Sequence, residues 1–247
     1  MDFINAIILL SNFVIVPSIT YGSQLALGAI GVTLIYGVLR FANFAYGDLM
    51  AFGTMCVILL TWLLKSWGIS LGILPTALLA LPFGIVLTIG VSLFFDRTVF
   101  EYYRNKKSSP VTFIVVSLGI MFVLNAVVRI IIGPNDIVFM DGARFIISAV
   151  EFRETTGLLE GLTIKSTQVI TVITTSITCY LLFNFLNKTK TGKSMRAYSN
   201  NEDLALLSGI DPNRIILITW IIVSILATIG GTLYGLDKSF KPFTYFN

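Results

Sequence analysis

Residues 187–214 read NKTKTGKSMRAYSNNEDLALLSGIDPNR, a polar and basic segment between two apolar runs, Thr167–Leu186 and Ile215–Leu236. Each run has about the 20 residues that an α-helix needs to cross a hydrocarbon core roughly 30 Å thick. The segment therefore joins two membrane spans, and it points to an all-α polytopic membrane protein.

A short helix is predicted inside this segment. Asn200–Asp203 can cap and start it, because side-chain oxygens there accept free backbone N–H groups. Gly209 lets the chain turn out of the helix, and Asp211–Asn213 ends it before the next span. Its apolar side would be formed by Leu204, Leu206, Leu207 and Ile210. Such a helix, held outside the bilayer, is suited to docking on another protein; the alternative is a solvated loop whose lysines only set the membrane topology.

A nucleotide site in this segment is excluded. Gly192-Lys193-Ser194 has the form of the end of a phosphate-binding loop, but the first glycine of that motif falls at Asn187. The motif also requires a preceding sheet strand, and here a membrane span precedes it.

The composition fits the membrane class. Of the 247 residues 55% are hydrophobic and 12% are charged, whereas about a quarter of a soluble domain is charged. The net charge of +4 comes from short loops between spans, so it favours membrane orientation over nucleic-acid binding. There is no histidine, and the two cysteines, Cys56 and Cys179, stand apart in apolar runs. We therefore expect no metal site, no cofactor and no catalytic residues.

The apolar runs predict a bundle of about six to seven transmembrane helices in a single domain over residues 1–247. In the last run, Ala227, Gly231 and Gly235 are spaced four apart, which is typical of a face that packs closely on another helix. We expect Asp96–Ser109 and Gly133–Ser166 to be polar loops, and Arg129 to reach the headgroups from within its span. The earlier spans are expected at Ile4–Val16 (a short segment), at two helices within Tyr21–Leu64, at Ile69–Phe95 and at Val111–Ile132.

The segment Phe41–Asp48 is expected to break the long apolar stretch into two helices. One interpretation is an ordinary tight connection at the membrane surface. The other is a discontinuous helix near a transport path, where irregular backbone is tolerated because it lines a cavity. Asn43 would then offer an amide, and Asp48 a carboxylate, to a polar solute or to a neighbouring helix.

Charged loops predict the orientation. The basic loops Arg97–Lys107 and Lys188–Arg214 alternate with Gly133–Ser166, in which acidic residues outnumber basic ones. By the positive-inside rule the two basic loops face the cytoplasm, and the short docking helix lies there with them.

Two motifs resemble one known family. Asp203-Leu204-Ala205 followed by Gly209 resembles the "EAA" coupling loop of ABC importer permeases, with Asp203 where Glu is commoner and Leu204 where Ala is commoner. With Thr191–Ala197 before it, which includes Arg196, it is similar to the version found in branched-chain amino acid permeases. The sequence NFAYGD at residues 43–48, after Tyr36-Gly37, also resembles these permeases, with Tyr46 in place of their usual His.

The resemblance implies a function without an active site. The chain would be an ABC importer permease subunit in the bacterial cytoplasmic (inner) membrane, surrounded by membrane lipid, moving branched-chain or related amino acids. Its partners would be ATP-binding subunits, a second homologous permease and a periplasmic substrate-binding protein. The ATPase-coupling residues would be Arg196, Asp203, Leu204, Ala205 and Gly209, and the substrate-pathway residues would be Asn43, Phe44, Tyr46, Gly47 and Asp48.

Some alternatives remain open. Permeases for urea and short amides are similar, and an ATP-independent secondary transporter would need an intramembrane ionisable relay, for which Asp48 and Arg129 are the candidates. Permeases of the family usually continue with a Gly-rich segment and further spans, so the chain is expected to lack the C-terminal spans of that family.

Overall fold

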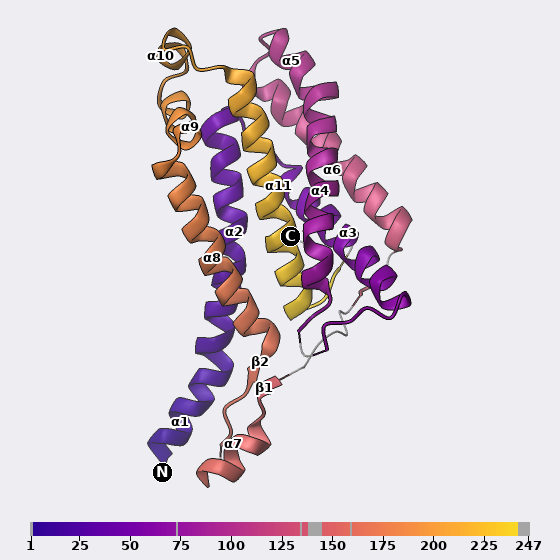
Figure 1. The fold of residues 1–247 in the computed structure, drawn as a ribbon, viewed down its shortest axis with the longest axis vertical. Coiled ribbons are helices and arrows are strands. Elements are labelled where there is room, and N and C mark those ends of the chain that lie inside the picture. Colours follow the sequence, from indigo (N-terminus) through magenta and orange to yellow (C-terminus); the bar gives the residue numbers. More distant parts are fainter. Residues whose placement is uncertain (1, 73, 134, 138–144, 159, 242–247) are drawn as a thin grey trace.

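The computed structural model describes residues 2–72, 74–133, 135–137, 145–158 and 160–241. Within these residues six helices are long and apolar enough to cross a membrane, and they pack into an elongated bundle (Figure 1). The predicted all-α polytopic fold is therefore confirmed. The six candidate spans are Phe3–Leu39, Tyr46–Ser66, Ala77–Asn105, Pro110–Ile132, Ser166–Lys188 and Pro212–Asp237.

The described elements include two very short strands. β1 and β2 form an antiparallel pair between the fourth and fifth spans. In chain order the elements are α1 (Asp2–Leu10), the π-helix η1 (Ser11–Ile15), α2 (Val16–Leu39), α3 (Tyr46–Ser66), α4 (Ala77–Phe95), the π-helix η2 (Asp96–Phe100), α5 (Glu101–Asn105), α6 (Pro110–Ile132), β1 (Phe145–Ile147), α7 (Ala149–Thr156), β2 (Ile164–Lys165), α8 (Ser166–Lys188), α9 (Lys190–Asn200), α10 (Glu202–Leu207) and α11 (Pro212–Asp237).

The centre of the bundle is α11, which packs against α2, α3 and α4. Within the most apolar stretch of α11, 72% of the residues are buried inside the protein, a larger share than in any other candidate span. Ala227, Gly231 and Gly235 are all buried, so the predicted packing face is confirmed. A methyl group at Gly231 would lie 2.6 Å from the carbonyl oxygen of Met50, which shows how closely the backbones of α11 and α3 approach.

The N-terminal segment differs from the expectation. Ile4–Val16 is not a separate short span, because α1 continues through η1 into α2 as one apolar helix, Phe3–Leu39, of 37 residues. At 1.5 Å per residue this helix is about 55 Å long, which exceeds the roughly 30 Å of a hydrocarbon core. The side chain of Asn12 holds the loop before β2, donating to the Gly161 carbonyl at 2.8 Å and accepting from the Thr163 N–H at 2.9 Å.

The segment Asp96–Ser109, expected to be a loop, is helical as far as Asn105. The helix continues because Asp96, whose charge indicated a loop, has partners inside the protein. Asp96 is buried, accepts a hydrogen bond from the Trp220 indole N–H at 2.8 Å and pairs with Arg104 at 3.2 Å. The π-helical turn η2 carries both Asp96 and the buried Phe100, whose ring stacks on Trp220.

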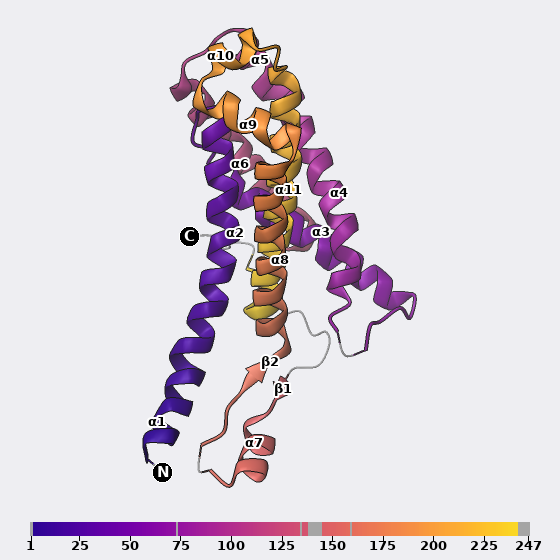
Figure 2. The ribbon, with the colours of Figure 1, turned by 60° about the vertical axis from the view of Figure 1, so that its left-hand side comes forward.

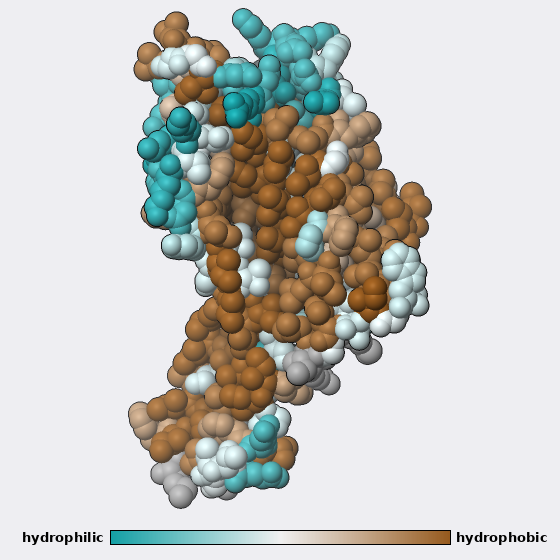
Figure 3. Space-filling view, in the orientation of Figure 1, coloured by the Kyte–Doolittle hydropathy of each residue, from teal (hydrophilic) through white to brown (hydrophobic). Residues whose placement is uncertain are grey.

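The two ends of the bundle differ. At one end, α7 lies beside α1, away from the main bundle (Figures 1 and 2). At the other end α5, α9 and α10 gather, and we call this the basic end. Figure 3 shows hydrophilic residues concentrated there, above a largely hydrophobic surface over the spans. Asp141 and Arg144 of the acidic loop lie outside the described residues.

Candidate functional site

The predicted short helix is present as α10, and its ends explain why it forms. The Asn201 side chain accepts a hydrogen bond from the Leu204 N–H at 3.0 Å and so caps the first turn. At the other end Gly209 has φ +79°, and the N–H groups of Gly209 and Ile210 donate to the carbonyls of Leu206 and Ala205. This is the hydrogen-bond pattern of a Schellman motif, which favours glycine at the left-handed position.

The faces of α10 are arranged differently from the expected single apolar side. Ala205 is buried against Met195 and Tyr198 of α9, and Ile210 packs on the same cluster. Leu207 is 85% exposed and Leu204 60% exposed, and Leu206 is exposed as well. Three leucines therefore face outward from a helix that is anchored through its small residue.

The sequence reading missed α9, which supports α10. Thr189 caps α9 by accepting from the Gly192 N–H at 3.0 Å, and the Tyr198 hydroxyl donates to the Glu202 carboxylate at 2.7 Å. Burial, together with the contact with Glu202, raises the pKa of Tyr198. Thr189 could have indicated this helix, because threonine often caps helices and this one directly follows an apolar span.

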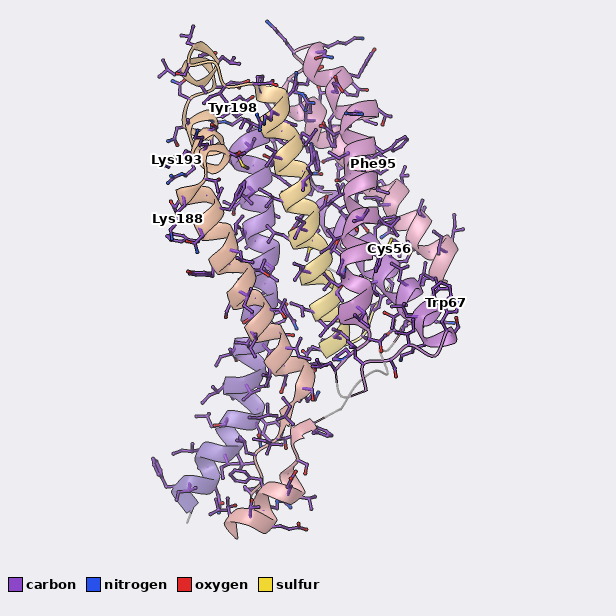
Figure 4. All side chains as sticks on the ribbon, viewed as in Figure 1. Cys56, Trp67, Phe95, Lys188, Lys193 and Tyr198 are labelled. Atoms are coloured by element: carbon purple, nitrogen blue, oxygen red, sulfur yellow. The ribbon has the colours of Figure 1, made fainter. Side chains whose placement is uncertain are left out.

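The expected coupling residues lie together at the basic end but make different contacts. Arg196 donates to the Asn187 side chain at 2.9 Å, and Asp203 is exposed in the first turn of α10. In Figure 4, Lys188 and Lys193 extend from the outer side of α8 and α9, whereas Tyr198 lies toward α11. Lys188 and Lys193 therefore lie on the outer side, away from Tyr198, which belongs to the cluster against which α10 packs.

The break between two helices falls inside Phe41–Asp48, as expected: α2 ends at Leu39 and α3 begins at Tyr46. Asn43 organises this turn, because its side-chain oxygen accepts from the Ala45 N–H at 3.0 Å. The Phe44 N–H donates to the Ser117 hydroxyl at 3.2 Å. Gly47 already belongs to the first turn of α3, so it is not the residue at which the helix breaks.

Tyr46 and Asp48, which follow this turn, contact different helices. Tyr46 is buried, and its hydroxyl occupies the space that a side chain would take at Gly31 of α2. Asp48 accepts a hydrogen bond from the Asn125 side chain of α6 at 2.8 Å. Arg129, one turn beyond Asn125, interacts electrostatically with Asp48. The predicted reach of Arg129 to the headgroups stays a prediction, and Asp48 is a neighbour of Arg129 inside the protein.

A direct contact connects the two candidate regions. The Ser199 hydroxyl of α9 donates to the Gly37 carbonyl of α2 at 2.8 Å, and the Arg40 guanidinium donates to the Ser199 carbonyl. The end of α9, immediately before α10, is thus fixed to the end of α2, immediately before the break. Asn43 also lines a small cavity of about 20 Å³ together with Leu49 and Trp220.

Known proteins similar to this chain are membrane transport components. Residues 14–247 match the family described as branched-chain amino acid transport system / permease component. The high-affinity branched-chain amino acid transport system permease protein LivH of Escherichia coli K12 is 26% identical over 221 residues, which cover 88% of this chain and 68% of that protein. BraD of Pseudomonas aeruginosa is 25% identical, covering 90% and 70%.

The similarity extends to an archaeal protein. The probable branched-chain amino acid transport permease protein LivH of Methanocaldococcus jannaschii is 28% identical over 233 residues, covering 92% of this chain and 67% of that protein. No solved structure matches the chain.

Proposed function

This chain belongs to the family of permease components of branched-chain amino acid transport systems, and from that premise we propose that it is the membrane subunit of an ABC importer for branched-chain or related amino acids. A separate ATPase supplies the energy, and the six spans carry the solute. Residues 1–247 would form one permease domain in a bacterial cytoplasmic membrane.

The observation that carries this proposal is the geometry of α10. A helix held by a capped start, a glycine turn and a buried alanine has no structural need for three leucines that face outward. Exposed apolar side chains gathered on one element are typical of protein interaction sites. The ATP-binding subunit is the partner that fits, because Asp203 and Ala205 of α10, with Gly209 just after the helix end, resemble the coupling motif of ABC importer permeases.

The proposal includes three further partners. A second, homologous permease would complete the pore, and a periplasmic binding protein would deliver the solute at the end where α7 lies. Membrane lipid would cover the spans.

Urea or a short amide is the alternative solute, and uptake of labelled leucine in competition with urea distinguishes the two. The ATP-independent transporter is less well supported, since Asp48 and Arg129 interact with each other instead of forming a chain across the membrane.

Changing Leu207 to Asp tests the docking of the ATPase. Leu207 is 85% exposed, so the carboxylate stays in water in the isolated chain and the fold is unaffected. In the complex it would be buried in an apolar groove, at a cost of 1.4 kcal/mol or more, which corresponds to at least a tenfold weaker association. Transport-coupled ATP hydrolysis by the complex purified from its native membrane is expected to fall about tenfold.

The matched control is Val150→Asp, which places the same charge on an exposed apolar residue of α7 at the opposite end. The amount of ATPase that co-purifies with this variant should equal the amount that co-purifies with the unchanged chain, because α7 lies at the end remote from α10. Full hydrolysis in Leu207→Asp, with the ATPase still bound, would show that α10 is not the docking helix.

Changing Asp48 to Asn tests the pathway residues. The asparagine carbonyl can still accept from Asn125, but the electrostatic interaction with Arg129 is lost, so stability should fall by about 1–3 kcal/mol and uptake is compared at equal amounts of folded protein. The charge that would meet the ammonium group of the solute is lost, and such a contact is worth about 1.5–3 kcal/mol. Leucine uptake is therefore expected to fall about tenfold.

Asn125→Ala is the complementary control, because it removes the hydrogen bond that Asp48→Asn keeps and leaves the carboxylate in place. If Asn125→Ala reduces uptake as much as Asp48→Asn does, the pair serves helix packing and the pathway assignment is wrong.

A further inference from the structure

A cavity of about 310 Å³ opens at the basic end, between α2, α6, α9 and α11. Its apolar wall comes from the spans and includes Phe41, Phe113 and Ile216. Its polar rim comes from the helix ends and carries three cationic side chains: Arg40, Arg104 and Lys107. A cavity with one apolar wall and one basic rim matches a ligand with an anionic group and an apolar portion.

The charges of the rim are only partly balanced within the chain. Arg104 pairs with Asp96 at 3.2 Å. Glu202 is the one acidic residue of the lining and accepts from the Tyr198 hydroxyl. Arg40 and Lys107 supply two more positive charges, so one positive charge remains after Glu202 is counted, which suits a ligand with a single negative charge.

Arg40 and Lys107 also share an unusual backbone conformation. Among the residues that the structure describes, they are the two non-glycine residues with positive φ, 62° for Arg40 and 51° for Lys107. Each follows the last turn of a helix: the Arg40 N–H donates to the Tyr36 carbonyl, and the N–H groups of Lys107 and Ser108 donate to Arg104 and Tyr103. This position favours glycine strongly, because a side chain there strains the backbone.

The same chain uses glycine at two comparable helix ends. Gly209 ends α10 with the hydrogen-bond pattern found at Lys107, and Gly157 ends α7 in the left-handed conformation. A cation near a helix C-terminus also interacts favourably with the helix dipole, but other positions of the last turn provide that contact without strain. Arg40 also donates to the Ser199 carbonyl, but a neutral carbonyl leaves its positive charge unbalanced. Two strained basic residues on the rim of one cavity point to a function of their charges.

We propose that this cavity binds the phosphate group of an anionic phospholipid, with Arg40 and Lys107 as the phosphate ligands and the apolar wall against the glycerol and the upper acyl chain. Basic pockets between transmembrane helices are suited to anionic headgroups. The phosphate could also come from a soluble ester, and the experiment separates the two sources.

The test uses the full chain purified in a neutral detergent. Phosphatidylglycerol, phosphatidylcholine and glycerol 3-phosphate are each titrated, and bound ligand is counted by native mass spectrometry. Phosphatidylglycerol is expected to bind at least tenfold more tightly than phosphatidylcholine. Saturation by glycerol 3-phosphate at equal concentration would support the phosphate site with a soluble ligand in place of lipid.

The variant Arg40→Gly/Lys107→Gly removes both cations and relieves both strained positions. It also removes the Arg40–Ser199 hydrogen bond, but the Ser199 hydroxyl still donates to the Gly37 carbonyl, so α9 should stay attached to α2 and the fold should be retained, as circular dichroism and gel filtration would verify. Binding of phosphatidylglycerol is expected to fall at least tenfold. The control, Lys188→Gln/Lys193→Gln, removes the same charge from the outer side of α8 and α9 (Figure 4) and should bind as the unchanged chain does. Undiminished binding in the double glycine variant, or an equal loss in the control, would overturn the proposal.

Discussion

Replacing Gly231 with alanine is expected to destabilise the bundle by about 3 kcal/mol, near the upper end of the cost of overpacking a well-packed core. The added methyl group would lie 2.6 Å from the Met50 carbonyl oxygen and would overlap the Thr54 hydroxyl. One of these atoms belongs to the backbone of α3, so a rotamer change does not relieve the overlap. The two helices must separate, and α11 loses contact where it is most buried.

Gly230→Ala is the control, since it makes the same change one residue away. Its methyl group would approach Met50 Cε at 3.0 Å, and that atom ends a flexible side chain that can move. It would also lie 3.3 Å from Leu27 Cβ, a tight contact that is still much longer than the 2.6 Å approach to the backbone at Gly231. Alanine is also favoured over glycine in a helix by up to about 1 kcal/mol, which offsets part of the cost. Thermal unfolding in detergent, followed by circular dichroism, compares the variants. Equal melting temperatures for the two would contradict the assignment of a backbone contact.

Replacing Asp96 with alanine is the second change with a large expected effect, again about 3 kcal/mol. The buried carboxylate accepts from the Trp220 indole N–H at 2.8 Å and pairs with Arg104 at 3.2 Å. Alanine leaves the buried Trp220 N–H and the Arg104 cation without this partner, so the desolvation of these groups is no longer compensated. The contact between η2 and α11 is expected to loosen, with a lower melting temperature and increased fluorescence quenching of Trp220 by acrylamide.

An exposed ion pair provides the comparison for this prediction. Asp136 and Lys241 lie 3.7 Å apart with about half of each side chain exposed, so Asp136→Ala should cost less than about 1 kcal/mol. Asp96→Asn should fall between the two, because the amide oxygen can still accept from Trp220. If Asp96→Ala unfolds at the same temperature as Asp136→Ala, the buried network contributes nothing to stability.

The sequence predicted those features that depend on local chemistry. Apolar runs long enough to span a bilayer located the helices, and Asn201 and Gly209 located the two ends of α10. The break at Phe41–Asp48 followed from polar residues inside an apolar stretch. In each case the determining residues lie within a few positions of the feature.

The features that the sequence did not predict depend on distant partners. The charges of Asp96–Asn105 indicated a loop, but Asp96 is satisfied by Trp220, which follows it by 124 residues. The partner of Asp48 is Asn125 on another helix, and the exposure of Leu207 depends on Ala205 packing against α9. The candidate site could therefore be located from the sequence, whereas its contacts required the packing of the spans.

The short connection between α10 and α11 has a mechanical consequence. Ser208 caps the end of α10, and only residues 209–211 separate it from Pro212, the first residue of α11. Even fully extended, three residues would reach only about 10 Å. Hydrogen bonds at Gly209, Ile210 and Asp211 already take up part of that reach. A displacement of α10 is therefore passed almost directly to α11 at the centre of the bundle. The helices that pack around α11 would then move in response to it.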